Sequence, residues 1–230
     1  MLNSKIFLSV GHDEYWSADQ RANVEAARDA GVNLSFWSGN EVYWETRWAT
    51  SIDGTGTPYK TLVSYKERWD NTNSDVNGTT STWRDPELGS GRPENALTGT
   101  IFTVDGYRLD AINVPYDMSK LRFWTNTAVA NIQPGQVYTL TKNLLGYEWD
   151  SDLDNGFRPA GLVPLSSTTV DVNSLLLDYG SAVGAGTANH SLTLYRAPSG
   201  ALVFGAGTVY WSWGLDSHHD NEVTPIDRNV

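Results

Sequence analysis

The stretch KIFLSVGHDEYWSADQRANVEAARDAGVNLSFW, residues 5–37, carries most of the information about the fold. Two apolar runs of strand length, residues 5–10 and 32–37, flank a segment with helical character. Ser17 is placed to cap that helix, with Gln20 three residues later as its capping-box partner. A connection of this length favours a right-handed parallel βαβ unit. The helix face expected to pack on the sheet carries small residues: Ala18, Ala22, Ala26 and Ala30.

The rest of the chain predicts a single domain, residues 1–230, with two further parts. Between residues 53 and 110 the composition turns to Gly, Thr, Asn, Asp and Pro, which indicates a long insertion that lines a cleft. After it come short apolar runs separated by turn residues, which predict a β-rich C-terminal half. The expected strands lie near residues 111–114, 143–149, 168–177, 191–196 and 201–205.

Charge and cysteine content exclude several classes of function. The chain has 16 basic and 27 acidic residues, a net charge of −11, and no cluster of Lys or Arg, so neither nucleic acid nor an anionic membrane is an expected partner. It has no Cys, which excludes disulfides and a cysteine nucleophile. No segment has the length of a membrane span. We expect a soluble protein, cytoplasmic or secreted, that is part of a larger chain.

Polar loops follow both strands of the expected βαβ unit. They are GHDEYW, residues 11–16, and SGNEVYW, residues 38–44. Because reactive groups collect beyond the carboxyl ends of parallel strands, both loops should present side chains to one cleft. Tyr15 and Tyr43 are expected to face each other there.

Five strings, GHDEYWS, SGNEVYWETRW, GYEWD, DNGFRPAGL and YRAPSGALVFGAGTVYWSWGLD, resemble the large (beta) subunit of N,N-dimethylformamidase and related bacterial domains. The resemblance implies an α/β, class I glutamine-amidotransferase-like (flavodoxin-like) three-layer core, here incomplete, that hydrolyses an amide with a mononuclear iron. The iron ligands then fall on Tyr15, Tyr43 and Glu148, and a small partner subunit is implied. Asn40 falls at a strand-to-helix elbow where amidotransferases carry their cysteine. Gly146 stands where the family enzyme has a histidine.

The residue types agree with this resemblance. Two phenolates and a carboxylate are hard oxygen donors that suit Fe(III), and a bound cation can activate water and polarise a carbonyl. His12, Asp13 and Glu14 are then candidates for proton transfer, and Asn40 for orienting the substrate. Taken alone, the Tyr-Trp pairs are more often core aromatics, and Glu148 has a surface salt bridge as its plain alternative.

Two further sets of residues are weaker metal candidates. Asp150, Asp152 and Asp154 resemble part of a calcium loop, although the glycine spacing departs from an EF-hand, and the alternative is an acidic turn. The cluster His218, His219 and Asp220 near the chain end is either a metal site or a solvated loop.

Two functions remain open at this point. The first is a metal-dependent hydrolase of small or N-substituted amide C–N bonds, with a small partner subunit or a homo-oligomeric assembly. The second is a non-catalytic module of a secreted modular protein that binds carbohydrate or a surface partner through exposed tryptophans.

Overall fold

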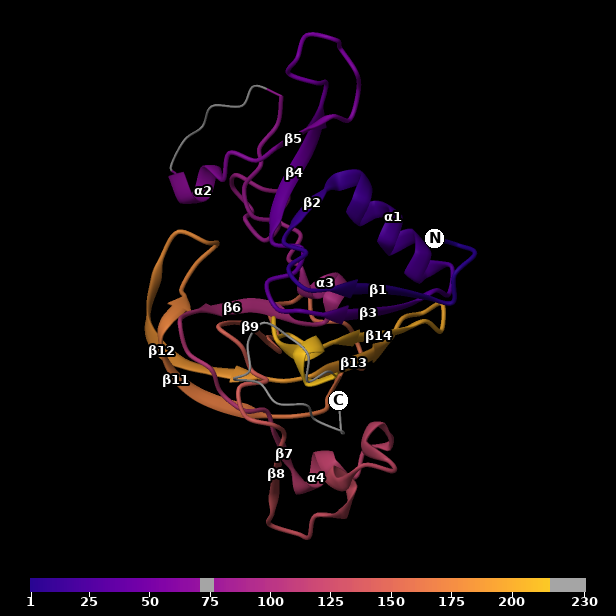
Figure 1. The fold of residues 1–230 in the computed structure, drawn as a ribbon, viewed down its shortest axis with the longest axis vertical. Helices are drawn as coiled ribbons and strands as arrows, with labels where there is room; N and C mark the ends of the chain where they lie inside the picture. Colours follow the sequence, from indigo (N-terminus) through magenta and orange to yellow (C-terminus); the bar gives the residue numbers. More distant parts are fainter. Residues whose placement is uncertain (71–76, 216–230) are drawn as a thin grey trace.

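The computed structural model describes residues 1–70 and 77–215, and β-strands dominate it (Figure 1). Strands account for 33% of residues and helices for 17%. The strands form several sheets rather than one, and a single long helix packs on the first of them.

The N-terminal βαβ unit is present as expected. Strand β1 (Ile6–Val10) pairs in parallel with β3 (Asn33–Trp37) over its whole length. Helix α1 (Ala18–Asp29) connects them after the short strand β2 (Tyr15–Ser17). The Ser17 hydroxyl accepts a hydrogen bond from the Gln20 amide at 3.2 Å, so the predicted cap is confirmed.

The prediction for the packing face of α1 was wrong. The helix buries Arg21, Val24 and Ala27, whereas the four alanines expected there are exposed. The buried Arg21 guanidinium explains the rotation of the helix, because it donates to the backbone carbonyls of Arg92 and Pro93 and lies 4.6 Å over the Trp83 ring. Contacts with a segment some seventy residues away thus decide which side of α1 faces inward.

The sheet that contains β1 and β3 is mixed and has five strands, in the order β1-β3-β14-β13-β10. β14 (Leu202–Gly205) joins β3 in parallel, but β13 (Thr193–Arg196) and β10 (Val163–Pro164) are antiparallel additions. The core between this sheet and α1 includes Trp16, Val24, Leu34, Phe36 and Val203.

The prediction of an α/β, flavodoxin-like three-layer core is wrong. Such a fold needs helical crossovers between parallel strands. After β3 the chain instead enters β4 (Trp44–Ala49), which pairs in parallel with β2, so Asn40 precedes a strand and occupies no strand-to-helix elbow. The remaining described helices are single turns: α2 (Glu67–Asp70), α3 (Asn95–Thr98), α4 (Tyr116–Ser119), η1 (Arg122–Trp124), η2 (Ala128–Asn131) and η3 (Trp211–Leu215).

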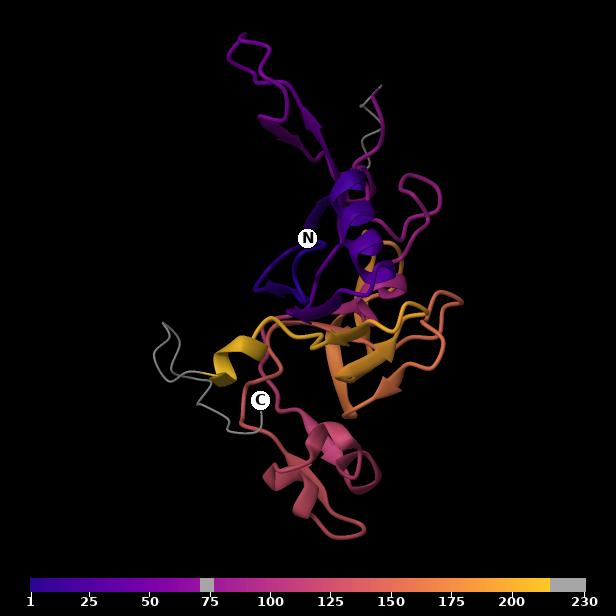
Figure 2. The same cartoon turned by 90° about the vertical axis from the view of Figure 1, so that its right-hand side faces the viewer.

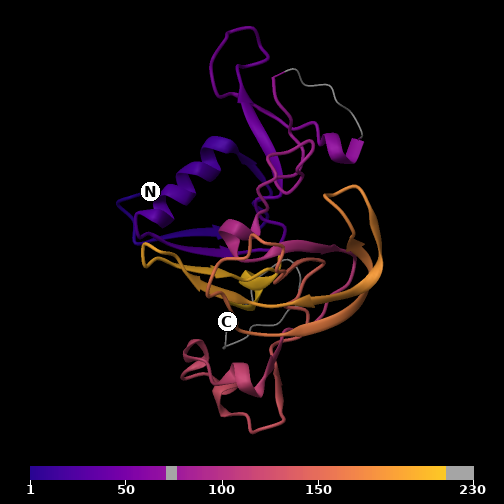
Figure 3. The same cartoon turned by 180° about the vertical axis from the view of Figure 1, so that it is seen from behind.

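A second, antiparallel sheet has the order β12-β11-β6-β9. β11 (Thr168–Leu176) and β12 (Val183–His190) form a long curved hairpin, visible at the side of the body in Figures 1 and 3. β6 (Ile101–Asp105) connects this hairpin to β9 (Glu148–Ser151). The main hydrophobic core lies against this sheet and includes Val104, Leu145, Trp149, Val172 and Leu192.

Two hairpins project from opposite ends of this body (Figures 1 and 2). One consists of β4 and β5 (Thr61–Val63), and the other of β7 (Asn113–Pro115) and β8 (Val137–Thr139) beside α4. Within residues 1–70 and 77–215, no helix has both the length and the apolar character required to cross a membrane.

Candidate functional site

The two polar loops lie side by side. The Val42 amide donates to the Asp13 carbonyl at 3.0 Å, and the Tyr43 amide to the Glu14 carbonyl at 2.9 Å. Asn40 and Val42 both have positive φ, 53° and 57°. That conformation is strained for a β-branched residue such as valine, and strain of this kind collects at functional sites.

Strand β9 brings Glu148 against these loops. The His12 Nε2 atom lies 2.5 Å from Glu148 Oε2, and Asn40 Nδ2 donates to the same oxygen at 3.2 Å. The approach is tight because a Cβ on Gly39 would lie 2.8 Å from the Glu148 carbonyl oxygen. Only glycine therefore fits at position 39 without a shift of one segment against the other.

Four of the predicted site residues, Glu14, Asn40, Tyr43 and Glu148, line one pocket of about 190 Å³. The other lining residues were not predicted as site residues, and three of them, Lys66, Trp69 and Asp105, carry polar or aromatic groups of interest here. Lys66 and Trp69 come from the 53–110 insertion, and Asp105 pairs in register with Glu148 across β6 and β9. The composition of the insertion indicated a cleft lining, but no motif marked these particular side chains.

The pKa is raised for His12, which contacts Glu148 beside the pocket, and for two carboxyls that line it, Glu14 and Asp105. The pKa of His12 is raised, chiefly because its ring is hydrogen-bonded to Glu148 and also by the charges of Glu148 and Glu14, against the opposing effect of burial. Burial raises the pKa of Glu14, and the nearby Lys66 ammonium partly offsets it. The pKa of Asp105 is raised by burial and by the charge of Glu148. Glu14 and Asp105 thus hold protons more readily than free carboxyls.

Two fully buried carboxyls lie behind the pocket. Burial raises the pKa of Asp150 to about 7, although Asn40 N and Thr100 Oγ1 donate hydrogen bonds to it. Burial and the charge of Asp13 raise the pKa of Glu41 well above its ordinary value.

Asp13 is not among the described residues that line the pocket. Its carboxylate accepts a hydrogen bond from Ser9 Oγ at 2.9 Å. The structure therefore places Asp13 with Glu41 and Ser9 behind the pocket rather than at its surface.

Only two of the three expected metal donors line the pocket. Tyr43 and Glu148 line the pocket, and Tyr43 is buried between Trp44 and Phe102, with ring centroids 5.1 Å from each. Burial raises the pKa of Tyr43. Tyr15 packs against this same aromatic cluster but is not among the described lining residues, and the Lys66 Nζ lies 4.9 Å over its ring.

The residues present nevertheless suit a hard cation. They supply phenol and carboxylate oxygens, and the buried Asn40 Oδ1 has no hydrogen-bond partner among the described residues. Within residues 1–70 and 77–215, no group of three His, Cys, Asp or Glu side chains is arranged to hold a metal ion.

The aspartates that were expected to bind calcium make contacts with other groups of the protein. Asp152 pairs with Arg158 at 2.6 Å, and Asp154 Oδ1 accepts from the Gly156 amide at 3.5 Å. Asp150 is buried behind the pocket. The other candidate cluster, His218, His219 and Asp220, lies outside the described residues.

The histidine that the resemblance expects at position 146 has no room there. A Cβ on Gly146 would lie 2.7 Å from Val209 Cγ2 and 3.1 Å from Tyr210 Cγ. The imidazole that contacts Glu148 comes instead from His12, on the loop after β1.

Carboxyl, carboxamide and phenol groups line this pocket, and the imidazole of His12 contacts one of its carboxyls. A family model described as N,N-dimethylformamidase beta subunit-like, C-terminal, matches residues 1–222, and the chain belongs to that family. No curated protein matches the chain significantly.

Proposed function

We propose that the domain hydrolyses the C–N bond of small or N-substituted amides, with a mononuclear iron held by Tyr15, Tyr43 and Glu148. Family membership supports the reaction class, because the family takes its name from an amide-cleaving enzyme. The contact of 2.5 Å between His12 and Glu148 carries the proposal, since it places a proton-exchanging group at a carboxylate that lines a pocket.

Iron, when bound, would supply a Lewis acid that polarises a carbonyl and lowers the pKa of water. The protein's own groups manage the protons. Amide hydrolysis removes a proton from water and delivers one to the leaving nitrogen. His12 and Glu14, both with raised pKa, can hold and deliver protons at the pocket.

Asn40 is suited to orient the substrate. Its Nδ2 is engaged with Glu148, whereas its Oδ1 is buried without a partner among the described residues. An unpaired buried oxygen is energetically unfavourable, so a substrate N–H that donates to Asn40 Oδ1 gains affinity. This favours primary and secondary amides as substrates.

Metal analysis and a visible spectrum of protein purified without chelator test the proposal. We expect about one iron per chain and a tyrosinate-to-iron absorption band that Tyr15→Phe and Tyr43→Phe each weaken and that is lost when the two are combined. Tyr59→Phe, on the exposed tip of the β4–β5 hairpin, is the control and should keep the colour. The same metal analysis measures calcium, which should be present if Asp150, Asp152 and Asp154 form a calcium site. Protein that neither contains iron nor takes up added iron would contradict the site.

Activity is then measured with N-methylformamide as substrate. His12→Asn should lower kcat, because it removes the imidazole while keeping a polar side chain. A His12→Asn enzyme with unchanged kcat would remove His12 from the mechanism and leave only the metal part of the proposal.

The alternative function, a non-catalytic binding module, has one supporting observation. Trp48 and Trp69 are exposed, by 45% and 57%, as tryptophans in carbohydrate-binding surfaces often are. Trp69, however, lines the pocket, and several other tryptophans are buried in the cores: Trp16, Trp44, Trp83, Trp124, Trp149 and Trp211. An iron-free, amidase-inactive protein whose tryptophan fluorescence responds to cellohexaose would support this alternative.

The family name refers to a beta subunit, which supports a partner subunit for this chain. A homo-oligomer is the other assembly we expected. Light scattering of the isolated chain distinguishes a monomer that awaits a partner from a self-assembled species.

A further inference from the structure

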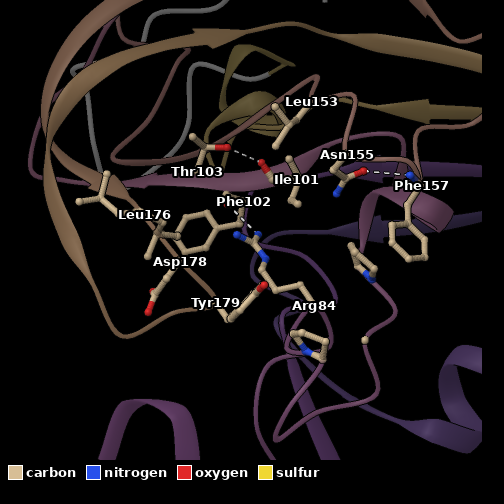
Figure 4. A pocket seen from close by; sticks show the side chains of 14 residues that line it. Arg84, Ile101, Phe102, Thr103, Leu153, Asn155, Phe157, Leu176, Asp178 and Tyr179 are labelled. Atoms are coloured by element: carbon tan, nitrogen blue, oxygen red, sulfur yellow. Dashed lines mark hydrogen bonds between the residues drawn. The ribbon is translucent and has the colours of Figure 1, made fainter.

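A second pocket of about 600 Å³ adjoins the candidate site (Figure 4). Its lining comes from the insertion, from β6, from the loop after β9 and from the turn after β11. Its volume is typical of small-molecule sites, roughly 300–1,000 Å³, whereas the pocket at Glu148 is smaller than that range. The larger pocket therefore offers about three times the space of the pocket at Glu148.

Three polar side chains of the larger pocket, Arg84, Asp178 and Asn155, are already paired within the protein. Arg84 donates to Glu94 and to the Phe102 carbonyl, and Asp178 accepts from the amides that follow it in the turn. Asn155 is bonded to Asn95. What remains for a ligand is apolar surface from Phe102, Leu153, Phe157, Leu176 and Leu177.

The two pockets share a wall. Phe102 and Leu176 line both of them, and the Phe102 ring also contacts the Tyr43 ring at 5.1 Å. Figure 4 shows the Phe102 ring between Leu176 and the Arg84 guanidinium. The apolar compartment thus lies on the other side of these two side chains from the pocket at Glu148.

We propose that the larger pocket binds an apolar, ring-sized substituent on the amide nitrogen, so that the substrates are arylalkyl secondary amides rather than the smallest amides. The inference rests on the proposed hydrolase function and names its substrate class. Burying a phenyl ring in such a compartment contributes favourably because it removes apolar surface from water.

Calorimetric binding of N-benzylformamide and N-methylformamide tests this, since the two share the same amide and differ only in the ring. We expect N-benzylformamide to bind at least about tenfold more tightly. Phe157→Glu and Leu153→Glu should each remove most of that difference. Both side chains are about half exposed, 46% and 50%, so these substitutions should leave the fold intact, as thermal melting will show. Ile52→Glu, on the distant β4–β5 hairpin and 92% exposed, is the matched control and should change nothing.

Turnover of the same two amides separates the two hypotheses. Hydrolysis of both amides with equal affinity would overturn the pocket assignment while leaving the hydrolase intact. A third outcome is that N-benzylformamide binds tightly, that Phe157→Glu weakens this binding, and that iron-loaded protein does not hydrolyse the compound. This outcome would contradict the hydrolase function, and the larger pocket would then not be a site for part of a substrate. A larger kcat/KM for N-benzylformamide that Leu153→Glu abolishes would support both.

Discussion

His12 and Glu148 lie 136 positions apart in the sequence, yet their side chains meet at 2.5 Å. The contact joins the loop after β1 to β9, which belong to different sheets. It forms only when both sheets are assembled, so the site and the tertiary structure depend on each other. The carboxylate raises the pKa of the imidazole through their hydrogen bond.

Glu148→Gln should lower the pKa of His12 towards its ordinary value, because the largest cause of the raised pKa is the hydrogen bond with Glu148. An NMR titration of the His12 ring measures this directly. Glu87→Gln is a suitable control, since Glu87 is an exposed carboxyl that pairs with Arg68. An unchanged His12 pKa in Glu148→Gln would mean that the two side chains do not interact in solution.

Asp150 should make stability depend on pH. Its folded pKa, about 7, lies above the ordinary 3.8, so the folded state binds this proton more tightly than the unfolded state. The associated stabilisation is fully present below pH 3.8 and is lost as pH rises to about 7, by roughly 4 kcal/mol at most.

Asp150→Asn removes this titration but keeps the shape of the side chain. Relative to wild type, its free energy of unfolding should therefore improve between about pH 4 and about pH 8, as measured by urea denaturation. Asp117→Asn, an exposed residue of α4, should show no such trend. Parallel pH profiles for wild type and Asp150→Asn would show that Asp150 does not titrate in this range.

The sequence was informative where the determinants of structure are local. The βαβ unit followed from two apolar runs and a cap, all within residues 5–37. The strand β12 escaped prediction because its sequence VGAGTANH is rich in Gly and Ala, and its pairing with β11 holds it in place. The prediction of a three-layer core was wrong because one βαβ unit does not determine how the remaining strands join the sheet.

The same distinction holds for the site. Glu14, Asn40, Tyr43 and Glu148 were found from motifs, and they do line one pocket. Asp105 was not foreseeable, because only the register of β6 against β9 places it beside Glu148.

Gly39→Ala should disturb the site through the backbone. The added Cβ would meet the Glu148 carbonyl at 2.8 Å and the Trp149 Cα at 3.0 Å, and backbone atoms cannot rotate away. We expect a loss of stability of about 1–3 kcal/mol and a His12 pKa closer to its ordinary value, because Glu148 moves. Chemical denaturation and the NMR titration measure the two effects.

Gly106→Ala provides the comparison, because its Cβ would meet only the Ser174 side chain, at 3.3 Å, which can adjust. A Gly39→Ala protein with wild-type stability and an unaltered His12 pKa would show that β9 and the loop after β3 are not in close contact.

Arg84, which lines the larger pocket, forms a buried ion pair with Glu94. The Arg84 side chain also donates to the Phe102 carbonyl and lies 5.0 Å over the Tyr43 ring. Removal of one partner leaves the other charge buried and unpaired, which typically costs about 3–5 kcal/mol. We therefore expect Arg84→Met to lower the free energy of unfolding by about this amount.

The double variant Arg84→Met with Glu94→Gln distinguishes an unpaired charge from lost packing. The carboxamide introduced by Glu94→Gln is neutral and keeps an oxygen for the hydrogen bond that the Phe102 amide donates to this side chain, so the double variant should be more stable than Arg84→Met alone. Arg196→Met, at an exposed position, should change stability by less than about 1 kcal/mol. If the double variant is instead the less stable of the two, the loss in Arg84→Met comes from packing and the Glu94 charge is stabilised without Arg84.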